Sequence, residues 1–336
     1  MLSTKTEEES TTVLQFVVNG IVVGGIFVLG AIGLSLTYGI RNFANFAHGE
    51  LMALGAYVAF TFNNMFEGVH VNIVLAAVVA FFVVSLVGVT LEYTVFHRLE
   101  GKGVVTLLIA SFGLFFILQN LVRLIWGTSP RLYFIPETLF GFSTREAIHL
   151  AFGISLTIIQ MFTLLIAVIL VTFLHLLLKY TKLGKAMRAT SDNFELAKVT
   201  GINTWLVIIW TWFIGAGFAA VAGVLLGLNT QLRPIMGFQV LLFLFAAVIL
   251  GGIGSAYGAL VGGLAIGIAN EVSKFVLFSY GIDSAYSPAV AFGVLVIMLI
   301  VRPEGLLGGE PIWEDIKRLG IRMQQLARKI AATMTR

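Results

Sequence analysis

Polar residues whose types and spacing could do chemistry are concentrated in a few short stretches of this chain. The first is the segment NFAHGE at residues 45–50, which places an amide, an imidazole and a carboxylate at the expected start of a helix. There Asn45 can cap the helix, and the Glu50 carboxylate faces the positive end of the helix dipole. The alternative is that Asn45, His48 and Glu50 line a substrate pathway, because ionisable groups at membrane depth mark such routes.

A second candidate site is the loop at residues 185–203, where Glu195 and Ala197 precede Gly201. The polar pair at 192–193 can cap a short helix, the small Ala197 permits close approach of a partner, and Gly201 supplies a left-handed cap at the end. An ordinary solvated helix explains the same pattern. The candidate docking residues are Arg188, Glu195, Ala197 and Gly201.

The third stretch is the glycine-rich segment at residues 251–258. Glycines favour a break between two short helices here, and Gly252, Gly254 and Ser255 could expose backbone carbonyls and helix ends to a central cavity. Close packing of neighbouring helix backbones is the alternative interpretation, since glycines recur at four-residue spacing from Gly254 onward.

Several kinds of catalytic site are excluded by what the sequence lacks. The chain has no cysteine, which removes disulfides, thiolate metal sites and cysteine nucleophiles. Neither Gly101-Lys102 nor Gly184-Lys185 has the flanking residues of a phosphate-binding loop, and no His-Glu-x-x-His helix or Gly-x-Ser-x-Gly elbow is present. We therefore expect no catalysis by this chain, no cofactor and no metal site.

The elements that must position these residues are membrane helices. Of the 336 residues, 58% are hydrophobic and only 11% are charged, a ratio that one soluble core could not hide. Apolar runs of about 20 residues or more can each cross a bilayer. The expected helices are 13–37, 46–62, 71–93, 105–126, 150–178, 205–229 and 285–301, with residues 240–273 split in two by the glycine-rich segment.

The distribution of cations predicts the orientation of these helices. Loops 94–104 and 179–204 and the tail after Arg302 carry most of the Lys and Arg residues and should be cytoplasmic. All three assignments agree only if residues 240–273 cross twice, which gives about nine crossings, with the N-terminus outside and the C-terminus inside. We expect an all-α polytopic transmembrane bundle of about 8–10 spans. An inverted repeat stays open, as does coincidence between two polar turns.

Three regions follow from this organisation. Residues 1–12 form an acidic tail outside, and residues 13–301 form the transmembrane domain with a cytoplasmic loop at 179–204. Residues 302–336 form a basic cytoplasmic tail, part of which can make an amphipathic helix at the membrane surface. The formal charge of +4 comes from short loops instead of one basic face, so nucleic acid is not an expected partner and membrane lipid is.

Several blocks together resemble the branched-chain amino acid permeases of the LivH type. Besides NFAHGE at 45–50, the matching blocks are Leu36-Thr37-Tyr38-Gly39, Gly201-Ile202-Asn203, Phe213-Ile214-Gly215-Ala216, the run from Val248 to Ser255, and Arg302-Pro303-Glu304-Gly305. The loop at 185–203 resembles the "EAA" loop of ATP-binding-cassette importers, with Leu196 in place of the usual middle alanine. NFAHGE favours the LivH type over the companion LivM type.

The resemblance implies a permease subunit that translocates branched-chain amino acids or related small solutes across the inner or plasma membrane. It implies a second, LivM-like permease, two ATP-binding subunits and an extracytoplasmic solute-binding protein as partners. Two alternatives remain: a sugar permease of the ribose type, and a secondary transporter coupled to an ion gradient. The latter would need a charge deep in a span, and Glu92 and Glu271 are expected near helix ends instead.

Overall fold

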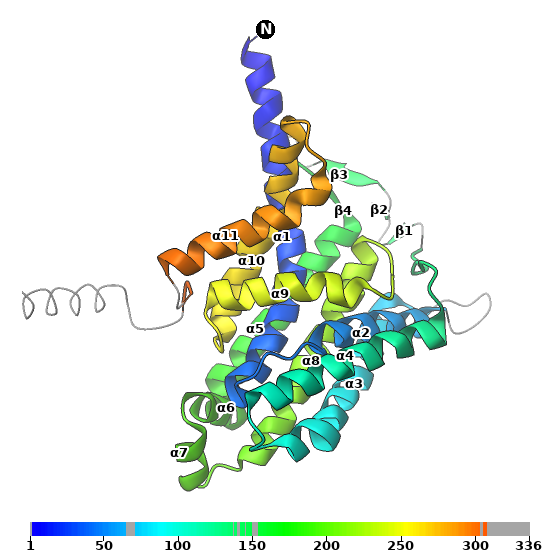
Figure 1. Ribbon diagram of the computed structural model, residues 1–336. Coiled ribbons are helices and arrows are strands. Elements are labelled where there is room, and N and C mark those ends of the chain that lie inside the picture. The colour runs from blue at the N-terminus through cyan, green and yellow to red at the C-terminus, as the bar shows by residue number, and fades with distance from the viewer. Residues whose placement is uncertain are drawn as a thin grey trace, which may run out of the picture.

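The computed structural model describes residues 2–64, 71–136, 138–139, 142–144, 146–149, 154–302 and 305–307. Eleven α-helices and four short strands lie in this part of the chain (Figure 1). The predicted all-α membrane bundle is confirmed. Residues 308–336, most of the predicted basic tail, lie outside the described residues.

Seven of the described helical segments are long and apolar enough to cross a membrane. They are α1 (Leu2–Arg41), α3 (Ile73–Leu91) with its continuation to Leu99, α4 (Val104–Trp126), α5 (Ile158–Tyr180), α8 (Thr204–Asn229), α10 (Ala256–Ser279) and α11 (Ser287–Val301) with the turn before it. The first helix thus continues at both ends beyond the predicted 13–37.

Two further helices are shorter than a full span. They are α2 (His48–Asn63) and α9 (Met236–Gly251), each of 16 residues. At 1.5 Å per residue each covers about 24 Å, less than the hydrocarbon core of about 30 Å. The seven candidate spans in the described part of the chain are fewer than the nine crossings predicted, and whether α2 and α9 supply the other two stays a prediction.

The helix expected at residues 150–178 begins later than predicted, which corrects that boundary. Residues Ser155–Thr157 form strand β4, paired antiparallel with β3 (Ala147–His149), and α5 starts at Ile158. The reason is a capping box: Thr157 accepts from the Gln160 amide, and the Gln160 side chain accepts from the Thr157 amide. Strands β1 (Thr138–Leu139) and β2 (Phe142–Ser143) form a second small hairpin near β3 and β4 (Figure 1).

The break expected within residues 240–273 is confirmed, but only the helix before it is short, since α10 has 24 residues. Helix α9 ends at Gly251, and α10 begins at Ala256 with Ser255 as its cap. Gly252 and Gly254 have φ angles of 108° and 82°, which a side chain with a Cβ rarely adopts. The segment after α11 closes over this break, because the amides of Leu306 and Leu307 donate to the carbonyls of Leu250 and Gly251 at 2.7 and 2.9 Å.

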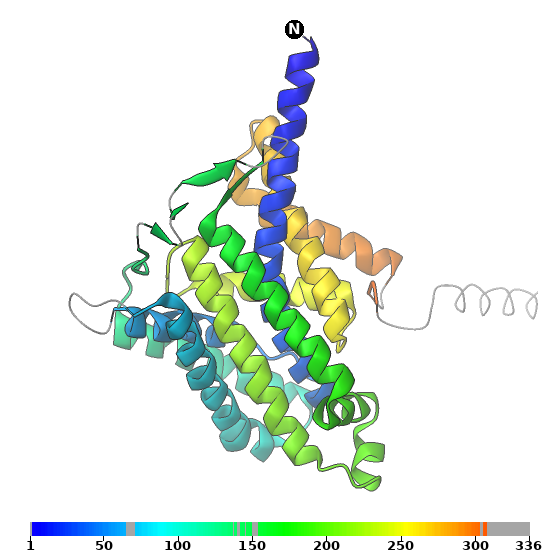
Figure 2. The ribbon, with the colours of Figure 1, turned by 180° about the vertical axis from the view of Figure 1, so that it is seen from behind.

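The helices form two units with the same element order. In α1–α2–α3 and in α8–α9–α10, a long helix is followed by a six-residue turn, a 16-residue helix and another long helix. Helices α1 and α8 run in opposite directions (Figures 1 and 2). Helices α2 and α3 pack on α8, while α9 and α10 pack on α1. This exchange is what an inverted repeat produces.

Glycines allow the backbones of these units to approach closely, as their spacing predicts. Along α10, Gly262 faces Ala247 of α9, while Gly263 faces Val28 of α1. A Cβ on Gly263 would lie 2.8 Å from the Val28 amide nitrogen, so a larger residue would push the helices apart. Helices α1 and α8 are the most deeply buried spans and form the centre of the bundle.

Candidate functional site

The loop between α5 and α8 folds into two short helices, α6 (Lys182–Asp192) and α7 (Phe194–Val199). Asn193 caps α7 by accepting from the Leu196 amide at 2.9 Å, so of the two predicted capping residues the structure uses Asn193. Gly201 has a φ of 86°, and its predicted left-handed conformation is confirmed. The amide of Ile202 donates to the Ala197 carbonyl and that of Gly201 to the Lys198 carbonyl, which together make a Schellman motif.

Helix α7 lies at one end of the molecule (Figure 1), and two of its apolar side chains are exposed. Leu196 is 59% exposed and Val199 is 83% exposed, while Ala197 is buried against the bundle. Glu195 and Arg188 are exposed. Large apolar groups that stay exposed on a helix outside the spans are suited to contact with a partner protein. Thus Ala197 fixes α7 to its own chain, and Leu196, which departs from the usual alanine, lies on the outer surface.

Asn45, His48 and Glu50 come together at the start of α2, in the centre of the bundle. All three side chains are buried, with exposed fractions of 1% or less. His48 Nε2 lies 3.0 Å from the Gly30 carbonyl of α1. Asn45 does not cap α2 as predicted, because Ala47 holds the cap position. Instead, Asn45 Oδ1 accepts from the Ala47 amide at 3.1 Å and closes the turn that precedes the helix.

Glu50 lies at the positive ends of two helices. It occupies the first turn of α2, and a Cβ on Gly237, the second residue of α9, would be 3.0 Å from Glu50 Oε1. Gln119 of α4 donates to the same oxygen at 3.4 Å, and the positive charge of Arg123 acts on Glu50 from the next turn of α4. The starts of α2 and α9 and the side-chain amide of Gln119 therefore surround this buried carboxyl group. The sequence analysis did not predict its contact with Gln119.

Gly252, Gly254 and Ser255 do not join this central group. They lie at the other end of α9, beside α6 and the end of α1. A Cβ on Gly39 would lie 2.7 Å from Ser191 Oγ of α6 and 3.2 Å from the Gly254 carbonyl. The glycine-rich break and α6 thus both contact the end of α1 at Gly39, and the six residues predicted for a substrate pathway fall into two separate places.

Sequence reasoning missed a buried ion pair between α1 and the continuation of α3. Arg41 at the end of α1 pairs with Glu92, whose side chain is fully buried, and also with Glu100 at 3.1 Å. The sequence analysis explained Glu92 by its position near a helix end. In the structure, its pairing with Arg41 also accounts for the buried carboxylate. Burial would raise the pKa of Glu100, but the neighbouring Arg41 and His97 lower it below its ordinary value. Arg41 and Glu92 are 51 residues apart, and no sequence pattern indicated that they would pair.

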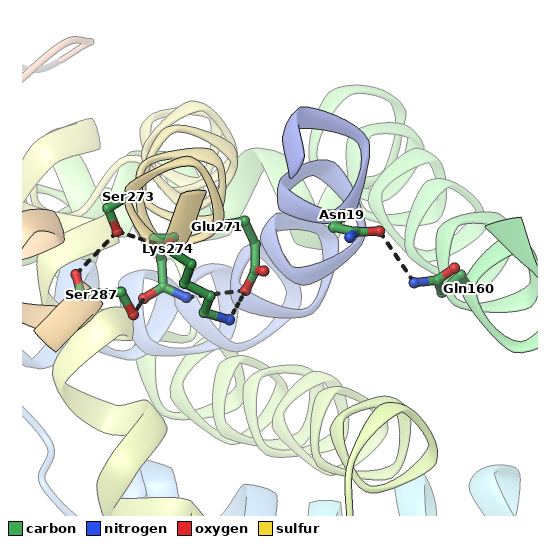
Figure 3. A network of polar contacts seen from close by, with 7 residues as sticks. Asn19, Gln160, Glu271, Ser273, Lys274 and Ser287 are labelled. Carbon is green, nitrogen blue, oxygen red and sulfur yellow. Dashed lines mark hydrogen bonds and ion pairs between the residues drawn. The ribbon is translucent and has the colours of Figure 1, made fainter. Parts of the chain in front are cut away.

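Glu271 likewise lies inside α10 instead of at its end, which corrects its expected position. It forms an ion pair with Lys274 one turn later, and Asn270 Nδ2 donates to it at 3.2 Å. Asn270 Oδ1 in turn accepts from Ser287 Oγ of α11 at 3.2 Å (Figure 3). Because the Glu271 carboxylate pairs with Lys274 of the same helix, its place inside α10 needs no role in ion coupling. Within the described residues, no group of three His, Cys, Asp or Glu residues could hold a metal ion.

Comparison with known proteins identifies the family to which this arrangement belongs. Residues 16–299 match the family described as branched-chain amino acid transport system, permease component. The chain belongs to this family of branched-chain amino acid permeases. It is a multi-pass membrane permease, and the predicted resemblance is confirmed.

Individual relatives support the same assignment. The permease is 35% identical over 305 residues to the high-affinity branched-chain amino acid transport system permease protein LivH of Escherichia coli (strain K12), covering 88% of this chain and 95% of that protein. It is 33% identical over 306 residues to BraD of Pseudomonas aeruginosa, with the same coverage. Identity to LivM of Salmonella typhimurium is 26%, over 84% of this chain and 68% of that protein. The predicted LivH type is therefore favoured. The weaker similarity of this chain to LivM indicates a system with paired permeases.

Proposed function

We propose that this permease imports branched-chain amino acids as one of two membrane subunits of an ATP-driven importer. A LivM-like permease is its partner, two ATP-binding subunits dock in the cytoplasm, and an extracytoplasmic solute-binding protein delivers the substrate. The observation that carries the proposal is the family match over residues 16–299, together with the short helix α7, which lies outside the spans and exposes Leu196 and Val199. The named relatives are components of branched-chain amino acid transport systems.

The α6–α7 loop is suited to transmitting movement of the ATP-binding subunits. Helix α6 packs on α5 so closely that a Cβ on Gly184 would overlap the backbone of Leu177 and Leu178. At its other end, Ser191 contacts Gly39 of α1. Because protein interiors are close-packed, a displacement of α7 is transmitted through α6 to α1 and α5. Arg188, Glu195, Ala197 and Gly201 are proposed as the residues that shape this docking element.

Movement is also required at the proposed substrate pathway. Asn45, His48 and Glu50 are covered by the chain's own helices, so they contact substrate only after α2 and α9 shift relative to α1 and α8. Such a shift around a central site is alternating access. At the break, Gly252, Gly254 and Ser255 are proposed to act at the cytoplasmic exit because Gly254 contacts Gly39 near the end of α1.

The charge distribution supports an orientation with the N-terminus outside and the C-terminus in the cytoplasm of an inner or plasma membrane. The α6–α7 loop carries an excess of cations, which remain on the cytoplasmic side during insertion. These cations are Lys179, Lys182, Lys185, Arg188 and Lys198. In this orientation α7 meets the ATP-binding subunits, which carry out the only catalysis, and the β-hairpins face outside.

Reconstitution in proteoliposomes tests the proposal. The permease, its LivM-like partner and the ATP-binding subunits should take up L-leucine only with ATP and the solute-binding protein. L-valine and L-isoleucine should compete, and D-ribose should not. Uptake driven by a proton or sodium gradient without the ATP-binding subunits would overturn the ATP-driven assignment, and competition by D-ribose alone would overturn the substrate class.

A further inference from the structure

A cavity of about 450 Å³ lies at the end of the molecule that carries the α6–α7 loop. It is lined by the end of α1, by α6 and by the glycine-rich break between α9 and α10. We propose that it binds a free α-amino acid with an aliphatic side chain, through which the imported product slows its own import. The inference rests on the proposed function for the cytoplasmic orientation and for the class of solute.

The charges in the cavity suit a zwitterion. Arg188 and Asp192 both line it and lie four residues apart on one face of α6. Within the part of the chain that the structure describes, neither side chain makes an ion pair. Positions four apart on a helix bring side chains to within about 5–6 Å of each other. The carboxylate and ammonium of one α-amino acid can therefore contact Arg188 and Asp192 at the same time.

The start of α10 adds donors for the carboxylate. The first amides of a helix have no acceptor within the helix. In α10 the Gly258 amide donates to the Ser255 hydroxyl at 3.0 Å, and Ala256 and Tyr257, the first two residues of the helix, line the cavity. A helix start is favourable for an anion, and Arg188 across the cavity provides a second contact for the same carboxylate.

Apolar residues in the same cavity fit the aliphatic side chain. Leu36, Leu178, Ile253 and Leu307 line it alongside the charged residues. The size falls within the range of about 300–1,000 Å³ that is usual for small-molecule sites. Asp192 disfavours a purely anionic ligand such as phosphate, and the apolar wall favours leucine over glycine. The combination of one cation, one anion and an apolar wall matches an amphipathic amino acid.

The position of the cavity predicts the effect of binding. Its walls belong to α6 on one side and to α1 and the start of α10 on the other, and Ser191 of α6 and Gly254 of the break both lie against Gly39 of α1. A ligand that joins Arg188 and Asp192 to the α10 amides stabilises the present arrangement of these elements. By linkage, it disfavours any other arrangement that the loop adopts during ATP hydrolysis. Product accumulating in the cytoplasm then slows the cycle.

The test uses the complete importer in proteoliposomes with the ATP-binding subunits facing the bath. The solute-binding protein and saturating L-leucine are enclosed in the lumen, and L-leucine is titrated into the bath while ATP hydrolysis is measured. We expect bath L-leucine to lower the rate by about fivefold or more. The same concentrations of 4-methylpentanoate, which lacks the ammonium, and of L-leucinamide, which lacks the carboxylate, should have little effect.

Variants assign the effect to this cavity. Asp192→Asn and Arg188→Gln should each raise the half-inhibitory L-leucine concentration by about tenfold, the loss expected for one charged hydrogen bond. Lys185→Gln, on the same helix but outside the cavity, should be inhibited like the wild type. Each variant is compared with its own uninhibited rate. Unchanged inhibition in both cavity variants, or equal inhibition by 4-methylpentanoate and L-leucinamide, would overturn the proposal.

A direct binding measurement separates this inference from the proposed function. Radiolabelled L-leucine is equilibrated with the purified importer lacking the solute-binding protein, for the wild type and for Asp192→Asn. If the wild type binds L-leucine and Asp192→Asn does not, the site is supported. This holds even if lumenal L-leucine fails to stimulate ATP hydrolysis, a result that would count against the proposed substrate. Absence of binding to the wild type overturns the site and leaves the proposed function untouched.

Discussion

Gly49 and Gly237 contact each other backbone to backbone at the centre of the bundle. A Cβ on either one would lie 2.5 Å from the carbonyl oxygen of the other. Each is the second residue of a 16-residue helix, so the starts of α2 and α9 meet at this point. The two units of the inverted arrangement are therefore joined where their short helices begin, beside Glu50.

Replacing Gly237 by alanine should destabilise the permease. The added methyl group collides with the Gly49 carbonyl and with Glu50, and overpacking of a tight interior costs about 1–3 kcal/mol. The apparent melting temperature of the detergent-solubilised protein, followed by size-exclusion chromatography after heating, measures the effect. Gly113→Ala in α4 is the matched control, since a Cβ there meets nothing within 4 Å. Equal melting temperatures for Gly237→Ala and Gly113→Ala would contradict this account.

Substitution of Gly201 should impair docking of the ATP-binding subunits. Its φ of 86° is strained for any β-branched residue, at a cost of about 1–2 kcal/mol, whereas asparagine tolerates this conformation. We expect Gly201→Val to reduce co-purification of the ATP-binding subunits and uptake together, with Gly201→Asn near wild type and Glu195→Ala intermediate.

Space around Gly201 is open, since a Cβ there meets nothing within 4 Å. Steric conflict inside this chain therefore cannot account for a loss, and the comparison of valine with asparagine isolates the backbone conformation. Membrane insertion should be unchanged at equal expression, because the spans are untouched. If Gly201→Val binds the ATP-binding subunits and transports like the wild type, the α6–α7 loop is not the coupling element.

Removing Arg41 should destabilise the permease more than removing the charge of Glu92. Arg41→Met leaves the buried Glu92 without its cation and Glu100 with His97 alone, and an uncompensated buried charge costs about 3–5 kcal/mol. Glu92→Gln leaves Arg41 its pair with Glu100. Heat-induced loss of the monodisperse peak should follow this order.

The double variant Arg41→Met with Glu92→Leu supplies the control for that comparison. Replacing a buried pair by apolar residues of similar volume is often neutral, so the double variant should recover part of the stability that Arg41→Met loses. Additive losses in the double variant would indicate that Arg41 and Glu92 do not stabilise the fold through each other.

Cysteine labelling tests the orientation without a background, because the chain has no native cysteine. Lys185→Cys on exposed α6 should react with a membrane-impermeant maleimide only in inverted vesicles. Glu146→Cys, exposed next to β3, should react only in intact cells or spheroplasts. Labelling of both positions from one side would exclude the proposed topology, and prior reaction with a permeant maleimide controls for accessibility.

By itself, the sequence determined the membrane class, the family and the local chemistry of the α6–α7 loop. Length and apolarity of the spans are properties of single segments, and the cap at Asn193 and the turn at Gly201 depend on neighbours within a few residues. The break at Gly252–Ser255 is local for the same reason. Such features can be predicted because no distant part of the chain is needed to form them.

Only the tertiary structure decided which of these segments meet. Gly49 and Gly237 are 188 positions apart, and the pairing of Arg41 with Glu92 and of Gln119 with Glu50 depends on how whole helices cross. The separation of Gly254 and Ser255 from His48 and Glu50 also follows from the direction of α9, which places its two ends at different depths. In a bundle whose helices are apolar on most faces, helix propensity and hydropathy are satisfied by many arrangements. Close glycine contacts and a few buried polar pairs select one of them.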